Sequence, residues 1–145
     1  MEEKDQTITR TQNYVVARFR DGRMIKGITY DFGPQKKLFH ITSTGEDGKR
    51  VFKIPLSELK AVFFVKSLEG RKGPLSLNGL LKEEADTVGS IKVKITFYDG
   101  ETLIGTTQGY TPEREGFFVV PSGRDSNNLR IFIISNAVKQ IETWR

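Results

Sequence analysis

The single histidine, His40, carries the side chain best suited to acid–base catalysis or metal binding. A catalytic triad would need a serine and an acid placed to meet it, but no serine lies in a nucleophile motif such as Gly-x-Ser-x-Gly. No carboxylates stand at metal-ligand spacing around it. Cysteine is absent, which excludes thiolate chemistry, disulfides and cysteine-ligated metal sites. We therefore predict no catalytic residue, no metal site and no cofactor, and expect that the protein is not an enzyme.

Two carboxylates recur in the same local sequence, Asp21-Gly22 and Asp99-Gly100. A pair of carboxylates can perform acid–base catalysis. However, each aspartate precedes a glycine and follows a strand-like stretch, and Asp-Gly is a preferred sequence for the type I′ turn of a β-hairpin. We therefore interpret both dipeptides as hairpin turns.

Phosphate binding is the third chemistry that the residue types permit. The net charge is +5, with the excess mainly in the first half of the chain, and such a charge attracts polyanions. The candidate nucleic-acid-binding residues are Arg18, Arg20, Arg23, Lys26, Lys36 and Lys37. Tyr30, Phe32 and Tyr110 could stack on bases nearby. A solvated sheet face is the other interpretation of the same basic residues.

These residues lie in a β-rich sequence that occurs twice, because the two Asp-Gly pairs are 78 positions apart. Gly27 matches Gly105 at this spacing, and Phe39 matches Phe117. Each copy contains five predicted strands, of which Ile91–Phe97 has the clearest alternation of apolar and polar residues. The predicted strands are 14–20, 24–30, 39–43, 50–56 and 61–65 in the first copy, and 91–97, 102–108, 117–121, 129–134 and 138–144 in the second.

The chain divides into four segments. A polar N-terminal segment (1–13) precedes the first repeat (14–66), and a Gly- and Pro-punctuated linker (67–89) leads to the second repeat (90–145). Within the linker, Asn78 could cap a short helix that runs to Glu84. The sequence has no signal-peptide pattern and no apolar run of membrane-spanning length, so we expect a cytoplasmic protein without a membrane partner.

The repeat resembles the Sm-like, SH3-type small β-barrel. The first copy carries the resemblance in Val16–Gly27 and Leu56–Phe64, and the second in Phe97–Gly100, Gly105 and Ser126–Phe132. More narrowly, the chain resembles an uncharacterised bacterial family of tandem barrel-like repeats, sometimes joined to cyclic-di-GMP-binding PilZ domains. The resemblance implies an all-β fold of two five-stranded barrels packed through a shared apolar interface.

Two departures limit what the resemblance implies about function. RNA-binding Sm proteins have an Asp-x-aromatic-Asn motif before the third strand, where this chain has Asp31-Phe32-Gly33-Pro34-Gln35. PilZ domains have an Asp-x-Ser-x-x-Gly motif, which Asp125-Ser126-Asn127 does not supply. Neither Sm-type RNA binding nor cyclic-di-GMP binding is therefore carried over.

Two predicted strands, 61–65 and 131–134, are apolar on both faces. A small barrel buries one face of a strand, so the sister repeat or another protomer must cover the second face. Only Lys60 and Lys66 protect 61–65, which we expect to be an outer strand, from edge-to-edge pairing. We therefore expect a homodimer. The favoured function is a cytoplasmic binding or adaptor module for another protein, and nucleic-acid or nucleotide-phosphate binding is the alternative.

Overall fold

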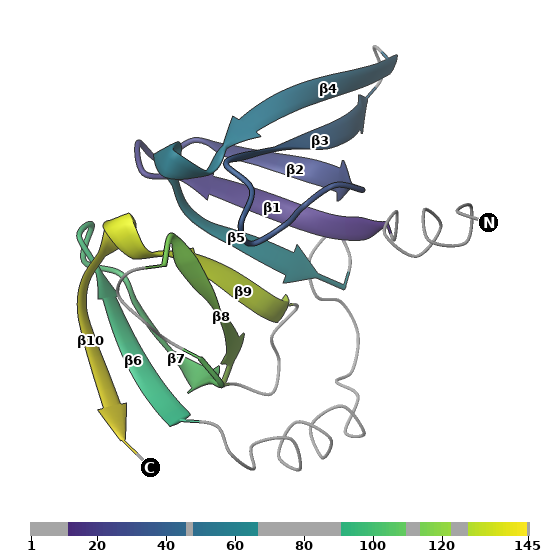
Figure 1. Cartoon of the computed structure of the whole chain (residues 1–145). Coiled ribbons are helices and arrows are strands. Elements are labelled where there is room, and N and C mark those ends of the chain that lie inside the picture. Colours follow the sequence, from purple (N-terminus) through teal and green to yellow (C-terminus); the bar gives the residue numbers. More distant parts are fainter. Residues whose placement is uncertain (1–11, 46–47, 67–90, 110–113, 123–127, 145) are drawn as a thin grey trace.

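The computed structural model describes residues 12–45, 48–66, 91–109, 114–122 and 128–144, and it is all-β, as predicted (Figure 1). Each predicted strand is present, with ends shifted by a few residues. The elements are β1 (Asn13–Phe19), β2 (Met24–Thr29), β3 (Leu38–Gly45), β4 (Gly48–Pro55), η1 (Leu56–Glu58), β5 (Leu59–Val65), β6 (Ile91–Phe97), β7 (Thr102–Thr107), β8 (Gly116–Pro121), β9 (Asn128–Ile134), η2 (Ser135–Ala137) and β10 (Val138–Trp144). The helix expected between Asn78 and Glu84 lies outside the described residues. No helix in the described ranges is long and apolar enough to cross a membrane.

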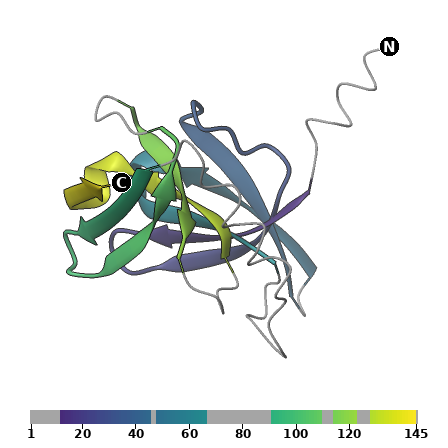
Figure 2. The same ribbon diagram turned by 90° about the horizontal axis from the view of Figure 1, so that it is seen from below.

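The strands form one antiparallel sheet in the order β10-β6-β7-β8-β9-β5-β1-β2-β3-β4. We call β1–β5 the first half and β6–β10 the second half. Each half has the same internal order, with its fifth strand beside its first and its fourth strand at the other end. The halves join where β5 pairs with β9, and we call this pairing the joint. Figure 2 shows that both halves are curved.

The sheet is open, so the expected pair of closed five-stranded barrels is not confirmed. A closed first barrel would pair β4 with β5, but β5 lies between β1 and β9. The expectation that Ala61–Val65 forms an exposed outer strand is wrong for the same reason. This strand is apolar on both faces, and a central position covers both its faces and both its edges.

Two hydrophobic cores lie in the two halves, and the central strands contribute to both. On β5, Val62 and Phe64 belong to the first core, whereas Ala61 belongs to the second. On β9, Phe132 enters the first core and Ile131 enters the second. Alternating side chains of one strand thus point into opposite cores. The sister repeat covers the second face of each strand, which is one of the two solutions that the sequence allowed.

Each Asp-Gly pair lies within a hairpin turn, but neither turn is of type I′. A type I′ turn needs positive φ at both central residues, and in the described residues only glycines have positive φ, such as Gly22 at 98° and Gly100 at 94°. The Gly22 N–H donates to the Phe19 carbonyl, and the Phe19 N–H donates to the Arg23 carbonyl. These bonds fit a three-residue loop in which glycine takes the left-handed position.

Candidate functional site

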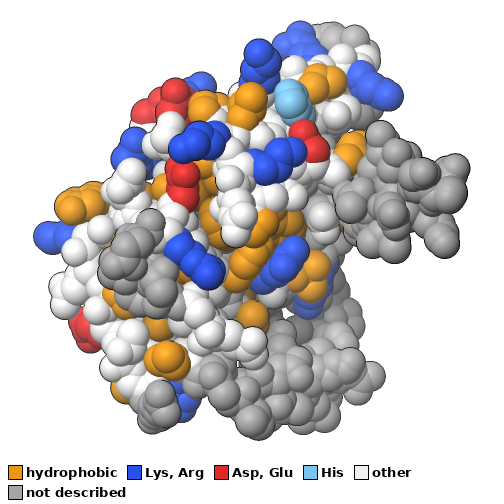
Figure 3. Space-filling model, viewed as in Figure 1, with side chains coloured by type: hydrophobic (Ala, Val, Ile, Leu, Met, Phe, Trp, Pro, Cys, Tyr) orange, Lys and Arg blue, Asp and Glu red, His pale blue; other side chains and the backbone are white. Residues whose placement is uncertain are grey.

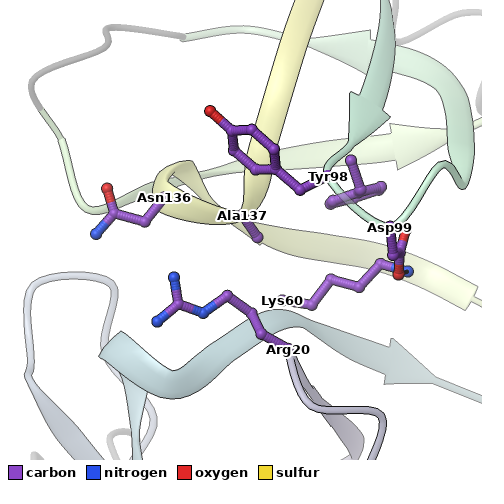
Figure 4. Close-up of a pocket in the computed structure, with 7 residues that line it drawn as sticks. Arg20, Lys60, Tyr98, Asp99, Asn136 and Ala137 are labelled. Atoms are coloured by element: carbon purple, nitrogen blue, oxygen red, sulfur yellow. Dashed lines mark hydrogen bonds and ion pairs between the residues drawn. The ribbon is translucent and has the colours of Figure 1, made fainter.

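A cleft of about 460 Å³ opens where the two halves meet (Figure 4). The β1–β2 turn and β5 supply one side, and the β6–β7 turn and η2 supply the other. Its lining residues are Arg20, Lys60, Phe97, Tyr98, Asp99, Asn136 and Ala137. The cleft therefore depends on the joint between the halves.

Lys60 contributes a buried cation to the cleft, although the sequence predicted that it protects an outer strand. Its side chain crosses from the first half to the second, where Nζ donates to Asp99 Oδ2 at 2.8 Å and also to Glu101. The Lys60 ammonium lies 4.7 Å from the centroid of the Phe97 ring. Burial of an unpaired ammonium is costly, so these carboxylates allow Lys60 to lie at the joint.

The two turns facing each other across the cleft are anchored in equivalent ways. The Arg20 N–H donates to the Glu58 carbonyl at the end of η1, and the Tyr98 N–H donates to the Ala137 carbonyl at the end of η2. Arg20 and Tyr98 thus occupy matching positions in the two repeats. The guanidinium of Arg20 also donates to the Ser57 carbonyl at 2.7 Å, which fixes its direction toward the cleft (Figure 4).

The chemistry of the cleft is suited to binding. Arg20 and Asn136 supply hydrogen-bonding groups, and Phe97 and Ala137 supply apolar surface. Tyr98, a residue that is 70% exposed, supplies an aromatic ring. A guanidinium with free donors binds carboxylate groups, and an exposed aromatic ring packs on flat or apolar groups. The arrangement fits one or two side chains of another molecule.

The Lys60–Asp99 ion pair should make the stability of the fold depend on pH in the acidic range. The hydrogen bond from Lys60 and then the Glu101 N–H hold the pKa of Asp99 below its ordinary 3.8. A carboxylate with a lowered folded-state pKa stabilises the fold above its unfolded-state pKa, and that stabilisation is lost as pH falls through the folded-state value. We expect Lys60→Met to raise the pKa of Asp99 toward 3.8 and to reduce the loss of stability below about pH 4. An NMR titration of the Asp99 carboxyl measures the shift.

Lys139→Met is the matched control, because Lys139 is the equivalent of Lys60 on β10 and is exposed. It should leave the titration of Asp99 unchanged. An unchanged pKa of Asp99 in Lys60→Met would show that the buried ammonium does not stabilise this carboxylate.

The basic residues predicted for nucleic-acid binding do not form one cluster. Arg20 lies in the cleft. Arg23 forms an ion pair with Asp21 at 2.9 Å and lies over the Phe19 ring, and Arg18 lies 3.9 Å from Glu101. In Figure 3 the Lys and Arg side chains on the drawn face alternate with acidic and apolar ones. Nearby carboxylates therefore weaken the positive field of this surface.

The three predicted lysines lie away from the cleft. Lys36 donates to the Asp31 carbonyl at 2.9 Å, Lys26 is exposed on β2, and Lys37 is exposed in the β2–β3 loop. Of the stacking candidates, Tyr30 is 46% exposed and Tyr110 lies outside the described residues. Tyr30 is therefore the one described candidate that an incoming base could reach without repacking of the core.

Phe32, the remaining candidate, packs inside the first half instead. Its ring makes edge contacts with Phe39, Phe64 and Phe132, at centroid distances of 5.1, 5.2 and 5.3 Å. Since Phe132 belongs to β9, this aromatic cluster also crosses the joint. The sequence placed Phe32 in a turn next to the basic residues but contained no signal that it would be covered by the second half.

His40 forms a pair with Asp31 that no pattern in the sequence indicated. His40 Nδ1 lies 2.8 Å from Asp31 Oδ2, and the His40 N–H donates to Asp31 Oδ1 at 3.0 Å. Burial alone would raise the pKa of Asp31, but the hydrogen bonds from the His40 ring and backbone lower it further than burial raises it. In the described part of the chain no group of three or more His, Asp or Glu is arranged to hold a metal ion.

Comparison with known proteins yields a family match. The model of a family described as a family of unknown function, DUF6982, matches residues 11–144. No curated protein and no solved structure matches the chain. The family match spans both repeats and the segment between them, so the pair of halves is the unit that recurs.

Proposed function

The chain belongs to the DUF6982 family, whose function is unknown, and we propose that it is a non-catalytic cytoplasmic binding module whose partner is another protein. In this proposal each half is an open variant of the Sm/SH3-like small barrel. The single observation that carries the proposal is the cleft at the joint, to which both halves contribute side chains. A binding site built by both repeats accounts for a family in which the repeats occur together.

The composition of the cleft supports a protein partner. Tyrosine and arginine are enriched among the residues that dominate the binding energy of protein interfaces, and Tyr98 and Arg20 both line this cleft. The cavity volume lies at the lower end of the range that binds small ligands, which also suits a side chain presented by a protein. The partner would insert an apolar or acidic side chain between Tyr98 and Arg20.

Nucleic-acid or nucleotide-phosphate binding is the alternative function. The exposure of Tyr30, next to Asp31 whose carbonyl accepts a hydrogen bond from Lys36, favours it. The local pairing of Arg18 and Arg23 with carboxylates counts against it, because each neutralised cation contributes less to phosphate binding.

The test compares two exposed tyrosines. The unmodified chain, Tyr98→Ala and Tyr30→Ala are each used to capture partners from the native host, with and without nuclease. A captured protein is then purified and titrated against each of the three. We expect the partner to survive nuclease treatment and Tyr98→Ala to weaken its affinity on the order of tenfold or more, the effect of losing about 1.4 kcal/mol at an interface anchor. Tyr30→Ala should bind like the unmodified chain.

The opposite pattern supports the alternative. If nuclease abolishes capture and Tyr30→Ala weakens binding while Tyr98→Ala does not, the module binds nucleic acid and the cleft has no part in it.

A further inference from the structure

The open sheet ends in two strands that each have one paired neighbour. In the described residues, β4 pairs with β3 and β10 pairs with β6, and these strands lie at the two ends of the strand order. Each therefore presents a row of backbone N–H and C=O groups that another strand can pair with.

The joint inside the chain shows what pairs with such a strand. It joins β5, the fifth strand of the first half, to β9, the fourth strand of the second half. The two edge strands are the other fourth and fifth strands of the chain: β4 is the fourth strand of the first half, and β10 is the fifth strand of the second half. We propose that β4 of one copy pairs with β10 of another copy, which repeats between chains the joint that already holds the two halves together.

The register of the joint can be transferred to the free edges. From the fourth strand onward the second half follows the first at an offset of 79, since β4 ends at Pro55 and β9 at Ile134, and η1 begins at Leu56 and η2 at Ser135. In the joint Val62 lies opposite Phe132, and Phe64 lies opposite Arg130. The transferred pairs are Ile141 opposite Lys53 and Thr143 opposite Val51.

The side chains on the two edges suit this pairing. Val51 on β4 is 63% exposed and Trp144 on β10 is 42% exposed, and the transferred register brings both to the same end of the new joint. Each edge thus covers an exposed apolar side chain of the other.

Charge favours a joint between unlike edges. β4 is basic, with Lys49, Arg50 and Lys53, so pairing two β4 strands would place like charges opposite one another. β10 carries one base, Lys139, and one acid, Glu142, so it lacks the positive charge of β4, and in the transferred register Glu142 lies opposite Phe52, next to Lys53. The expected homodimer is therefore not a twofold pairing of identical edges. Two copies closed by two β4–β10 joints form the smallest assembly, and a larger ring or a longer chain uses the same contact.

The interchain joint should be weaker than the joint inside the chain. Gln140 and Glu142 occupy the positions that correspond to Ala61 and Phe63, so less apolar surface is buried. We therefore expect association that depends on concentration.

The experiment measures mass by sedimentation or light scattering, with one edge blocked in each variant. Val51→Glu blocks β4 and Trp144→Glu blocks β10, and both positions are exposed, so the fold should persist; amide NMR spectra check this. The unmodified chain should exceed the mass of one copy, 16.5 kDa, at micromolar to submillimolar concentrations. Each variant alone should stay monomeric over the same range, with an association midpoint raised on the order of tenfold or more. Ile104→Glu, which charges a similarly exposed position on the inner strand β7, should assemble like the unmodified chain.

Mixing the two blocked variants separates the proposed joint from the pairing of two identical edges. Val51→Glu keeps an intact β10 and Trp144→Glu keeps an intact β4, so the mixture should form one joint and stop at two chains. A monomeric unmodified protein overturns the proposal, as does a mixture that stays monomeric. Full assembly of either blocked variant alone also overturns it, because its one intact edge would then be pairing with itself.

Discussion

Replacing Phe132 with alanine is expected to destabilise both halves together, although this residue belongs to the second half. The ring is fully buried in the core of the first half, 5.3 Å from Phe32 and 5.0 Å from Phe118 between centroids. Truncation of a buried phenylalanine to alanine costs about 3–5 kcal/mol, a large share of the roughly 5–15 kcal/mol that stabilises a typical domain. Because β9 is shared, the loss should lower one common unfolding transition.

Urea denaturation with two probes measures this effect. Trp144, the single tryptophan, reports on the second half, and amide NMR signals of β1–β4 report on the first half. Phe52→Ala is the control, because Phe52 is only partly buried and packs on the first core from within the first half. Phe52→Ala should lower the free energy of unfolding by less than Phe132→Ala does. If Phe132→Ala shifts the signals of one half and leaves the other at its original midpoint, the halves do not fold as a unit.

Gly27→Ala should be nearly as damaging, although it adds a single methyl group. A Cβ atom at Gly27 would lie 2.2 Å from the Thr42 carbonyl oxygen and 2.8 Å from Cγ2 of Ile41. The oxygen belongs to the backbone of the neighbouring strand β3, so the clash can be relieved only by moving β3 away from β2. We expect a loss of about 3 kcal/mol of unfolding free energy, at the upper end of the usual cost of overpacking.

The equivalent glycine of the second half provides a repeat of the test. A Cβ atom at Gly105 would lie 2.3 Å from the Val120 carbonyl oxygen, so Gly105→Ala should lose a similar amount of stability. Gly109→Ala is the control, since a Cβ atom there meets nothing within 4 Å, and it should change the urea midpoint little. Midpoints of Gly27→Ala and Gly109→Ala that agree within error would contradict the close approach of β2 and β3.

Part of the candidate site was visible in the sequence. Arg20 was predicted as a basic residue on the surface. Tyr98 lies 78 positions further along, at the repeat spacing, so the repeat could have identified it as the equivalent of Arg20. Lys60 and Asn136 could not be found in this way. Lys60 resembles an edge-strand lysine, and only the joint brings it to the carboxylates of Asp99 and Glu101.

The sequence by itself determined the local structure of this protein. Alternation of apolar and polar residues located the strands, the Asp-Gly pairs located hairpins, and the 78-residue spacing established two equivalent halves. It also required a cover for both faces of Ala61–Val65. The strands and turns depend on residues within a few positions of one another, and the repeat is found by comparing the chain with itself, which is why sequence pattern suffices to predict them.

Only the tertiary structure decided which strand lies beside which. β5 could have closed a barrel by pairing with β4, or joined the sister half by pairing with β9, and both solutions satisfy the same apolar pattern. The choice depends on which pairing buries more of both faces, and that balance involves side chains such as Phe132 from a segment distant in the chain. The open edges, the cleft and the buried Lys60 all follow from this one pairing.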